Sequence, residues 1–323
     1  MEARVKLRNE LEVHILRSCP FCGSEKISNE LVAHEKSFGK GGNFTYGICS
    51  KCGSMYLEDI SYNLNLYYDN EEYYSFKNSE SILWEFVVKH SFKGRGFFFR
   101  FLRHFMIVNQ YFLSLSKVAA SKEAKILDVG SGTGTNLKYM INLGFKNVFG
   151  IDPYIDNEID HPFIVWKKRL SELDPSLKFD IIIYSHSLEH MDNPREELIQ
   201  AKSRLSSNGT IVVILPTVSH YFLKEFQENW VSIEAPRHLS IPSFFGFAIL
   251  SFLTDLKIVY YESTSEPVNF FISRRYKRSK TIPKSKTLGI VNTFLNPRFY
   301  YYRHLSRKLT ESNDGEVSIF FLS

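Results

Sequence analysis

The residues of this chain best placed to do chemistry form an acidic and glycine-rich segment, DVGSGTG, which begins at Asp128. The apolar run over 125–129 is typical of a short buried strand, and residues 135–143 have the apolar spacing of a helix. A glycine-rich turn between them lets backbone N–H groups and a helix N-terminus approach a ligand closely. A second strand, 147–151, ends at Asp152, where β-α-β nucleotide units place the acid that holds ribose hydroxyls. The pattern therefore predicts a site for a nucleoside-containing cofactor.

The cysteines form a second group with recognisable chemistry. The chain has four, in two Cys-x-x-Cys-Gly pairs: Cys19 with Cys22, and Cys49 with Cys52. Two thiolates separated by two residues can meet one ion from a tight turn, and the glycine that follows permits the positive φ that such a turn needs. A disulfide is the weaker alternative in a reducing compartment. We expect a tetrahedral zinc site, and because four thiolates fill the coordination sphere the ion should be structural.

The strands and helices expected around these residues indicate an α/β domain. Residues 179–184 (FDIIIY) predict a further buried strand, followed by the segment SHSLEHMDNP. Asn193 as N-cap and Pro194 at the first helical position then announce a helix. Strands are also expected at 210–215 and, near the end of the chain, at 316–322. Ligands of open α/β sheets bind at the carboxyl edge of the strands, where these motifs lie.

The glycine loop reads D-x-G-x-G-x-G, whereas a dinucleotide site would read G-x-G-x-x-G and cradle a pyrophosphate. An acid in the first turn suits a ligand with a cationic amine. With the FD-strand-HSLEH-x-D-x-P order, the loop resembles that of the class I S-adenosylmethionine-dependent methyltransferases. The resemblance implies a mostly parallel seven-stranded Rossmann-like sheet with helices on both faces, preceded here by the zinc-ribbon-like unit. It also implies the cofactor-binding residues: Asp128, Gly130, Ser131, Gly132, Gly134, Asp152, Ser185 and His186.

A wider set of motifs suggests the acceptor. The CxxCG pairs, YYSF, DVGSGTG, HSLEH and W-x-x-x-EAPRHL together resemble bacterial methyltransferases found with cell-surface polysaccharide synthesis genes, over roughly residues 19–275. The zinc unit and its tyrosine-rich tail also resemble those of deoxysugar C-methyltransferases. Because the chain ends shortly after its last strand, without the extra C-terminal domain of those enzymes, an oxygen acceptor is favoured. We expect methyl transfer to a hydroxyl of a sugar or glycan precursor. Methylation of RNA or protein is one alternative, and a non-catalytic zinc-containing scaffold is another.

Three interpretations fit the histidines. His190 and His238 are candidates for a catalytic base, since a histidine near pH 7 can take the proton of an alcohol. Alternatively His186, Glu189, His190 and His238 form a divalent-metal site, because H-x-x-E-H puts three ligands within about one helical turn. That pattern is similar to the E-x-x-E-H plus later His that holds Mg²⁺ in small-RNA 3′-end methyltransferases; His186 in place of the first acid shifts preference toward softer ions. In the third, Glu189 pairs with Arg237 or a histidine and only braces the loop.

The organisation expected from these signals is a zinc-binding unit (1–62), an aromatic-rich linker and helical cover (63–120) and a methyltransferase domain (121–323). The aromatic helix within 97–120 fits two interpretations, a lid packed across the cofactor cleft or a face resting on a membrane surface. A net charge of +5 is mild, so we expect no nucleic acid, and the basic stretch 274–280 reads as a solvated loop. No apolar run is long enough to span a bilayer and no signal peptide is evident, so we expect a cytoplasmic protein.

Overall fold

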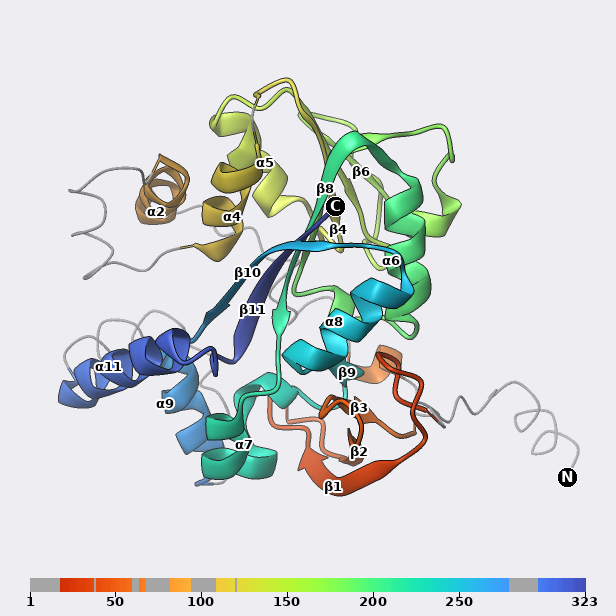
Figure 1. Cartoon of the computed structure of the whole chain (residues 1–323). Helices are drawn as coiled ribbons and strands as arrows, with labels where there is room; N and C mark the ends of the chain where they lie inside the picture. Colours follow the sequence, from red (N-terminus) through yellow and green to blue (C-terminus); the bar gives the residue numbers. More distant parts are fainter. Residues whose placement is uncertain are drawn as a thin grey trace, which may run out of the picture.

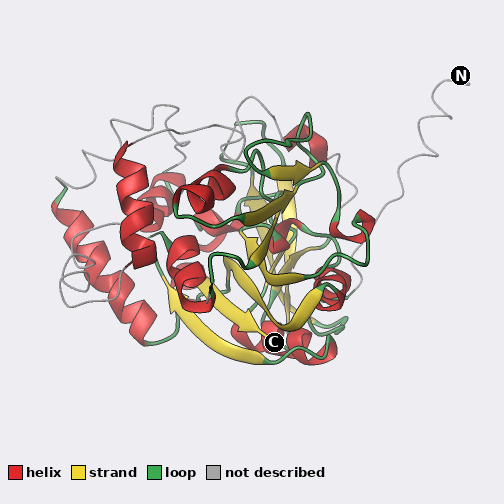
Figure 2. Cartoon of the chain, turned by 90° about the horizontal axis from the view of Figure 1, so that it is seen from above, coloured by secondary structure: helices red, strands yellow, loops and turns green. Residues whose placement is uncertain are grey.

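A computed structural model of the chain describes seven stretches of residues: 18–37, 39–59, 64–67, 82–93, 109–119, 121–278 and 296–323. The strands of these stretches form one sheet of seven strands and one of four. The large sheet lies at the centre with helices on both sides, and the small sheet lies beside its lower edge in the view of Figure 1. Seen from above in Figure 2, helices again flank the strands on either side.

The large sheet has the strand order β10-β11-β8-β7-β4-β5-β6. Its strands, in chain order, are β4 (Lys125–Val129), β5 (Asn147–Ile151), β6 (Ile164–Trp166), β7 (Phe179–Ser185), β8 (Leu205–Pro216), β10 (Ile258–Thr264) and β11 (Val317–Leu322). The pairs from β8 through β7, β4 and β5 to β6 are parallel. Strand β11 is antiparallel to both β8 and β10. The expected mostly parallel seven-stranded α/β sheet is therefore confirmed.

Both faces of this sheet are buried, which explains why its central strands are apolar throughout rather than alternating. The covering helices are α4 (Gln110–Val118) and α5 (Thr135–Asn142) on one face, and α6 (Pro194–Ser203) and α8 (Phe244–Leu253) on the other. Ile181 and Ile183 of β7 pack in the cluster that contains residues of α4 and α5. Ile182 and Tyr184, which point the other way, pack with residues of α6 and α8. The sheet is thus held between two separate apolar layers.

The helix expected before the first strand is seen in part. In α4, Phe112 and Leu115 are fully buried and pack in the same cluster as β4 and β7. The structure therefore supports packing for this part of the 97–120 segment, while residues 97–108 lie outside the described residues. Helix α2 (Ile82–Lys93) lies beside α4, and most of the tyrosine-rich segment lies outside the described residues too. No helix in the part of the chain that the structure describes is both long and apolar enough to cross a membrane.

The small sheet joins two distant parts of the chain. Its strands are β1 (Ile27–His34), β2 (Asn43–Cys49), β3 (Met55–Leu57) and β9 (Ser240–Ile241), in that order. Strand β9 follows the PRHL segment and pairs with β3 through Met55 opposite Ile241 and Tyr56 opposite Ser240. One sheet therefore contains strands from both sides of the domain boundaries proposed at 62 and 120. These boundaries stay predictions. The pairing also fixes the segment before β9 against the N-terminal unit.

The remaining helices surround that segment. They are α7 (His220–Phe226), α9 (Pro267–Tyr276) and α11 (Pro297–Glu311), with short 3₁₀ turns η1 (Leu64–Tyr67), η3 (Leu170–Glu172), η4 (Leu188–His190), η5 (Gln227–Asn229) and η6 (Val231–Ile233). A third apolar cluster contains residues of α7, α9 and α11 together with Trp230 and with Tyr46 of β2. The loop from Trp230 to His238 is therefore packed on several sides.

Candidate active site and cysteine cluster

The glycine loop begins directly after β4 and ends at the N-terminus of α5. Gly130, Gly132 and Gly134 all have a positive φ, of 77°, 55° and 78°. A Cβ on Gly130 would lie 2.6 Å from the Cβ of Ser187, and a Cβ on Gly134 would lie 2.4 Å from Cε2 of Phe163. Glycine is required at these two positions because the φ angle is positive and because a side chain would clash with its neighbour. The loop is therefore packed closely against neighbouring side chains, and its approach to a ligand stays a prediction.

Asp152 lies beside this loop. Its Oδ2 accepts a hydrogen bond from the N–H of Gly132 at 3.0 Å, and its Oδ1 accepts one from the N–H of Tyr154 at 2.9 Å. The side chain is buried, and burial raises its pKa above the ordinary value while the two N–H donors oppose this shift. Because a carboxylate oxygen has more than one lone pair, both oxygens can still accept from a ligand hydroxyl.

Asp128 lies in the strand that was expected over 125–129. It lies within β4 below the loop, 2% exposed, and the hydroxyl of Tyr111 donates to its Oδ2 at 3.0 Å. Burial raises the pKa of Asp128 to about 7, against the lowering effect of the Tyr111 hydrogen bond. The sequence analysis missed Tyr111, although a hydroxyl in an otherwise apolar helix face was a signal of a buried partner. The hydrogen bond ties α4 to the base of the loop.

At the end of β7 the chain turns sharply. Ser185 is the last residue of the strand, and His186 has a φ of 53° and donates its N–H to the carbonyl of Ile214 at 2.8 Å. The His186 ring is 45% exposed, whereas the side chain of Glu189, one turn later in η4, is fully buried. His186 Nδ1 and Glu189 Oε1 are 3.4 Å apart. The turn thus sends the acid inward and leaves His186 at the surface.

The structure brings together the three residues proposed for catalysis. The rings of His190 and His238 have centroids 4.8 Å apart. His238 Nε2 lies 3.9 Å from Glu189 Oε1, and Glu189, His190 and His238 each offer one ligand atom within 4.8 Å of the others. A backbone hydrogen bond from Leu239 to the carbonyl of Glu189, 2.8 Å long, joins the two segments. The hydroxyl of Tyr46 on β2 donates to the carbonyl of His238 at 2.9 Å.

A fourth residue of the cluster, Glu234, was not identified from the sequence. Its Oε2 lies 3.2 Å from His238 Nε2, and its Oε1 accepts from Arg237 Nη2 at 2.6 Å. Arg237 therefore pairs with Glu234, while Glu189 lies 3.4 Å from His186 and 3.9 Å from His238, so the loop-bracing interpretation, with Arg237 or a histidine as the partner of Glu189, stays open. Burial would raise the pKa of Glu234, but His238 and Arg237 hold it well below its usual range. Burial and the neighbouring His238 lower the pKa of His190 to about 4.

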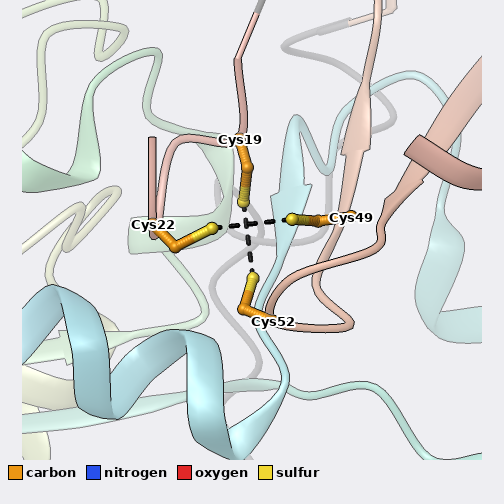
Figure 3. Close-up of side chains that lie close together, drawn as sticks. All are labelled: Cys19, Cys22, Cys49 and Cys52. Atoms are coloured by element: carbon orange, nitrogen blue, oxygen red, sulfur yellow. Dashed lines mark hydrogen bonds between the residues drawn. The ribbon is translucent and has the colours of Figure 1, made fainter. Parts of the chain in front are cut away.

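The four cysteines converge on one point, as Figure 3 shows. Cys19 and Cys52 have sulfurs 3.6 Å apart, and those of Cys22 and Cys49 are 3.5 Å apart. All four are buried, and the ligand atoms lie within 4.8 Å of one another. Zinc–sulfur bonds of ~2.3 Å in a tetrahedron place sulfurs ~3.8 Å apart, whereas a disulfide needs ~2.05 Å. The spacing fits a four-cysteine metal site and not a disulfide.

The backbone around the sulfurs has the expected turns. Gly23 and Gly53 have φ values of 70° and 73°, and their N–H groups donate to the carbonyls of Cys19 and Cys49 at 2.8 and 2.9 Å. Burial raises the pKa of the Cys22 thiol to about 11, and the neighbouring Cys49 and Cys52 raise it further. A bound cation would favour the ionised form of all four sulfurs.

Comparison with known proteins agrees with the fold. Residues 99–248 match the model of a family described as "Methyltransferase domain". The tRNA U34 carboxymethyltransferase of Actinobacillus pleuropneumoniae serotype 7 (strain AP76) is 29% identical over 110 residues, which cover 31% of this chain and 34% of that protein. The enzyme of the same name from Shewanella piezotolerans (strain WP3 / JCM 13877) is 32% identical over 101 residues, 27% of this chain and 30% of that one. The chain thus spans about a third of the length of these curated relatives.

Two solved structures are similar at low identity. The mycolic acid cyclopropane synthase CmaA1, complexed with SAH and CTAB, is 14% identical with a TM-score of 0.46, over 69% of this chain and 87% of that one. Coclaurine N-methyltransferase, bound to N-methylheliamine and SAH, is 15% identical with a TM-score of 0.42, over 65% of this chain and 70% of that one. The family match covers the glycine loop, Asp152 and the Glu189–His190–His238 cluster. This match to a methyltransferase domain, which spans somewhat less than half of the chain, agrees with the strand order of the large sheet.

Proposed function

We propose that the protein transfers a methyl group from S-adenosylmethionine to a hydroxyl of a sugar or glycan precursor in surface polysaccharide synthesis. One contact carries most of the argument: the glycine loop meets the histidine cluster. Gly130 packs so closely on Ser187 that no side chain fits between them, and Ser187 directly precedes η4. A cofactor on the loop would therefore lie next to the residues able to handle an acceptor.

The cofactor would be held by groups that the structure already arranges. Gly130, Ser131, Gly132 and Gly134 would pack against its methionine portion, and Asp152 would accept from the ribose hydroxyls. Asp128, held by Tyr111, would fix the base of the loop and add a carboxylate near the cationic amine. The backbone of Ser185 and His186 would close over the ligand from the β7 side.

The chemistry required of the protein is modest. The acceptor oxygen attacks the methyl carbon, the carbon–sulfur bond breaks, and S-adenosylhomocysteine leaves; correct placement of the two reactants supplies much of the rate. The acceptor must also lose its hydroxyl proton. A ring nitrogen of His190 or His238 can accept that proton, or the cluster can bind a cation that makes the hydroxyl more acidic. Proton acceptance and cation binding would use the same three side chains, the two histidines and the carboxylate of Glu189.

The cysteine cluster would hold one structural Zn²⁺. All four donors are thiolates, so the filled coordination sphere gives the ion no open position for catalysis. Its effect would be to fold the N-terminal unit and fix β3, on which β9 pairs. We place the protein in the cytoplasm, where thiols stay reduced. Contact of residues 97–120 with a membrane surface stays a prediction.

RNA is the second candidate acceptor, and the observation in its favour is the match to two tRNA U34 carboxymethyltransferases. The described part of the basic stretch makes contacts within the protein: Arg274 donates to the Tyr302 hydroxyl at 3.2 Å and Lys277 to the Glu225 carbonyl at 2.8 Å. These contacts occupy the charged groups of Arg274 and Lys277, which leaves fewer cationic donors for the phosphates of an RNA. The sugar acceptor is therefore preferred.

A turnover screen with methyl-labelled S-adenosylmethionine tests this choice. Nucleotide sugars, lipid-linked glycans and unmodified tRNA are offered to the purified chain, and label is counted in each acceptor. We expect label in a sugar-containing acceptor and none in tRNA. Label confined to tRNA would replace the glycan proposal by the RNA one. A Gly130→Val variant, which cannot form the loop, is the blank for each reaction.

A further inference from the structure

The two histidines of the cluster are fixed in the same orientation by backbone carbonyls. His190 Nδ1 lies 2.8 Å from the carbonyl oxygen of Arg237, and His238 Nδ1 lies 2.7 Å from that of Ser232. A carbonyl can only accept, so each Nδ1 carries the hydrogen. In the neutral ring, each Nε2 therefore presents a lone pair, and that of His238 lies 3.2 Å from Glu234 Oε2, which a metal ion would displace as its partner. Metal-binding histidines typically donate their other ring N–H in this way, which fixes the tautomer and the direction of the ligand atom.

The third member is a buried acid. The Glu189 side chain is fully buried, and neither of its carboxylate oxygens has a hydrogen-bond partner among the residues that the structure describes. The histidine nitrogens nearest to Oε1 belong to His186 at 3.4 Å and His238 at 3.9 Å. These two ion pairs are long, and a buried carboxylate that accepts no hydrogen bond remains costly. The carboxylate therefore favours a cation at this point.

We propose that Glu189, His190 and His238 bind one divalent first-row transition-metal ion, in a site separate from the cysteine cluster. Their ligand atoms lie within 4.8 Å of one another. A point equidistant from three such atoms is at most ~2.8 Å from each, so shifts of ~0.7 Å give ordinary metal–ligand bonds of ~2.1 Å. Two imidazoles and one carboxylate suit Mn²⁺, Fe²⁺, Co²⁺ or Zn²⁺ better than Mg²⁺ or Ca²⁺.

The set also leaves room for an acceptor. Three protein ligands leave open positions on the ion, and the neighbouring Ser187 lies against the glycine loop. A bound hydroxyl would lose its proton to solvent water more readily, and its oxygen would face the methyl group. This role rests on the proposed methyl transfer, whereas binding of the ion does not.

Manganese binding to the zinc-loaded chain tests the proposal. With the cysteine cluster already filled, Mn²⁺ is titrated and the free ion is counted by electron paramagnetic resonance. We expect one Mn²⁺ per chain in the wild type, and at least ~10-fold weaker binding in Glu189→Gln and His238→Gln. His220→Gln is the matched control, because that ring is 95% exposed on α7 and its acidic partner is Asp314 rather than an acid of the cluster. It should bind Mn²⁺ like the wild type.

Two results would overturn the inference. One is a wild-type chain that binds neither Mn²⁺ nor Co²⁺ beyond the zinc site. In that case ion pairing of His238 with Glu189 and Glu234 would explain the cluster. The other is unchanged Mn²⁺ affinity in the two variants. If a variant does not fold, the wild-type count and a His190→Gln variant decide. Binding of S-adenosylhomocysteine is measured on the same samples: its absence contradicts the proposed function and leaves the metal result standing.

Discussion

Glu316, directly before the last strand, is hydrogen-bonded to the loop that carries Glu234 and His238. It is fully buried, and its carboxylate accepts three hydrogen bonds: from Trp230 Nε1 at 2.9 Å, from Ser232 Oγ at 2.9 Å and from Asn269 Nδ2 at 2.7 Å. Burial raises its pKa from 4.5 to about 7, although the three donors oppose the shift. The acid is therefore largely protonated in the folded protein at a pH where the unfolded chain has lost the proton.

The sign of the pH dependence follows. Between the unfolded pKa of 4.5 and the folded pKa of about 7, the folded state binds more protons than the unfolded state. The free energy of unfolding must then fall as pH rises, and the contribution is fully present below the first value and lost above the second. For these two pKa values, the loss between about pH 5 and pH 8 is about 2.5 kcal/mol from this one group.

The substitution that isolates this effect is Glu316→Gln, which keeps the size of the side chain and has no charge at either pH. Relative to wild type, its stability should improve by about 2.5 kcal/mol from about pH 5 to pH 8, or about 5 °C in melting temperature. Scanning calorimetry at both pH values measures the difference. Glu311→Gln, on the exposed side of α11, is the control and should change by less than ~0.5 kcal/mol. A gap between Glu316→Gln and wild type that is constant with pH would refute the reasoning.

Two further substitutions test the loop and the cysteine cluster. Gly130→Ala puts a Cβ 2.6 Å from that of Ser187, so S-adenosylhomocysteine affinity should fall at least ~10-fold by calorimetry. Gly144→Ala, also at a positive φ but with nothing within 4 Å of its Cβ, should bind normally; equal loss in both would point to backbone strain alone. Cys22→Ser should reduce zinc from one per chain to none by elemental analysis and expose the N-terminal unit to protease, while Ser50→Ala keeps its zinc. A metal-free wild type with a disulfide by mass spectrometry would defeat the zinc proposal.

Local patterns predicted the glycine loop and five of the seven strands of the large sheet, but not β6 or β10. The strand, glycine loop and helix from Lys125 onward are contiguous in the chain, and the position of Asp152 follows from the next parallel strand. Each of these features depends on the backbone conformation of only a few neighbouring residues. The same holds for the two cysteine turns, whose glycines have the positive φ that the spacing predicted.

Contacts between distant segments were harder to predict. Strand β9 has two residues, too few for a periodic pattern, and its pairing with β3 depends on packing of the whole loop. The same is true of Glu234 and Glu316, whose partners are brought near by tertiary structure. The partner of Asp128 was not predicted either: its carboxylate is buried and accepts a hydrogen bond from Tyr111 of α4. Such buried polar pairs carry no local sequence signature beyond a polar residue in an apolar run.

Calorimetry with S-adenosylhomocysteine tests the central claim, a nucleoside cofactor on the glycine loop, most directly. The account predicts one bound ligand per wild-type chain. It also predicts that Asp152→Ala weakens binding by roughly 1–3 kcal/mol, since a charged hydrogen-bond acceptor is lost. Asp160→Ala removes an exposed acid from the same connection and should leave the affinity unchanged. A wild-type protein that binds NAD(H) and ignores S-adenosylhomocysteine would contradict the account.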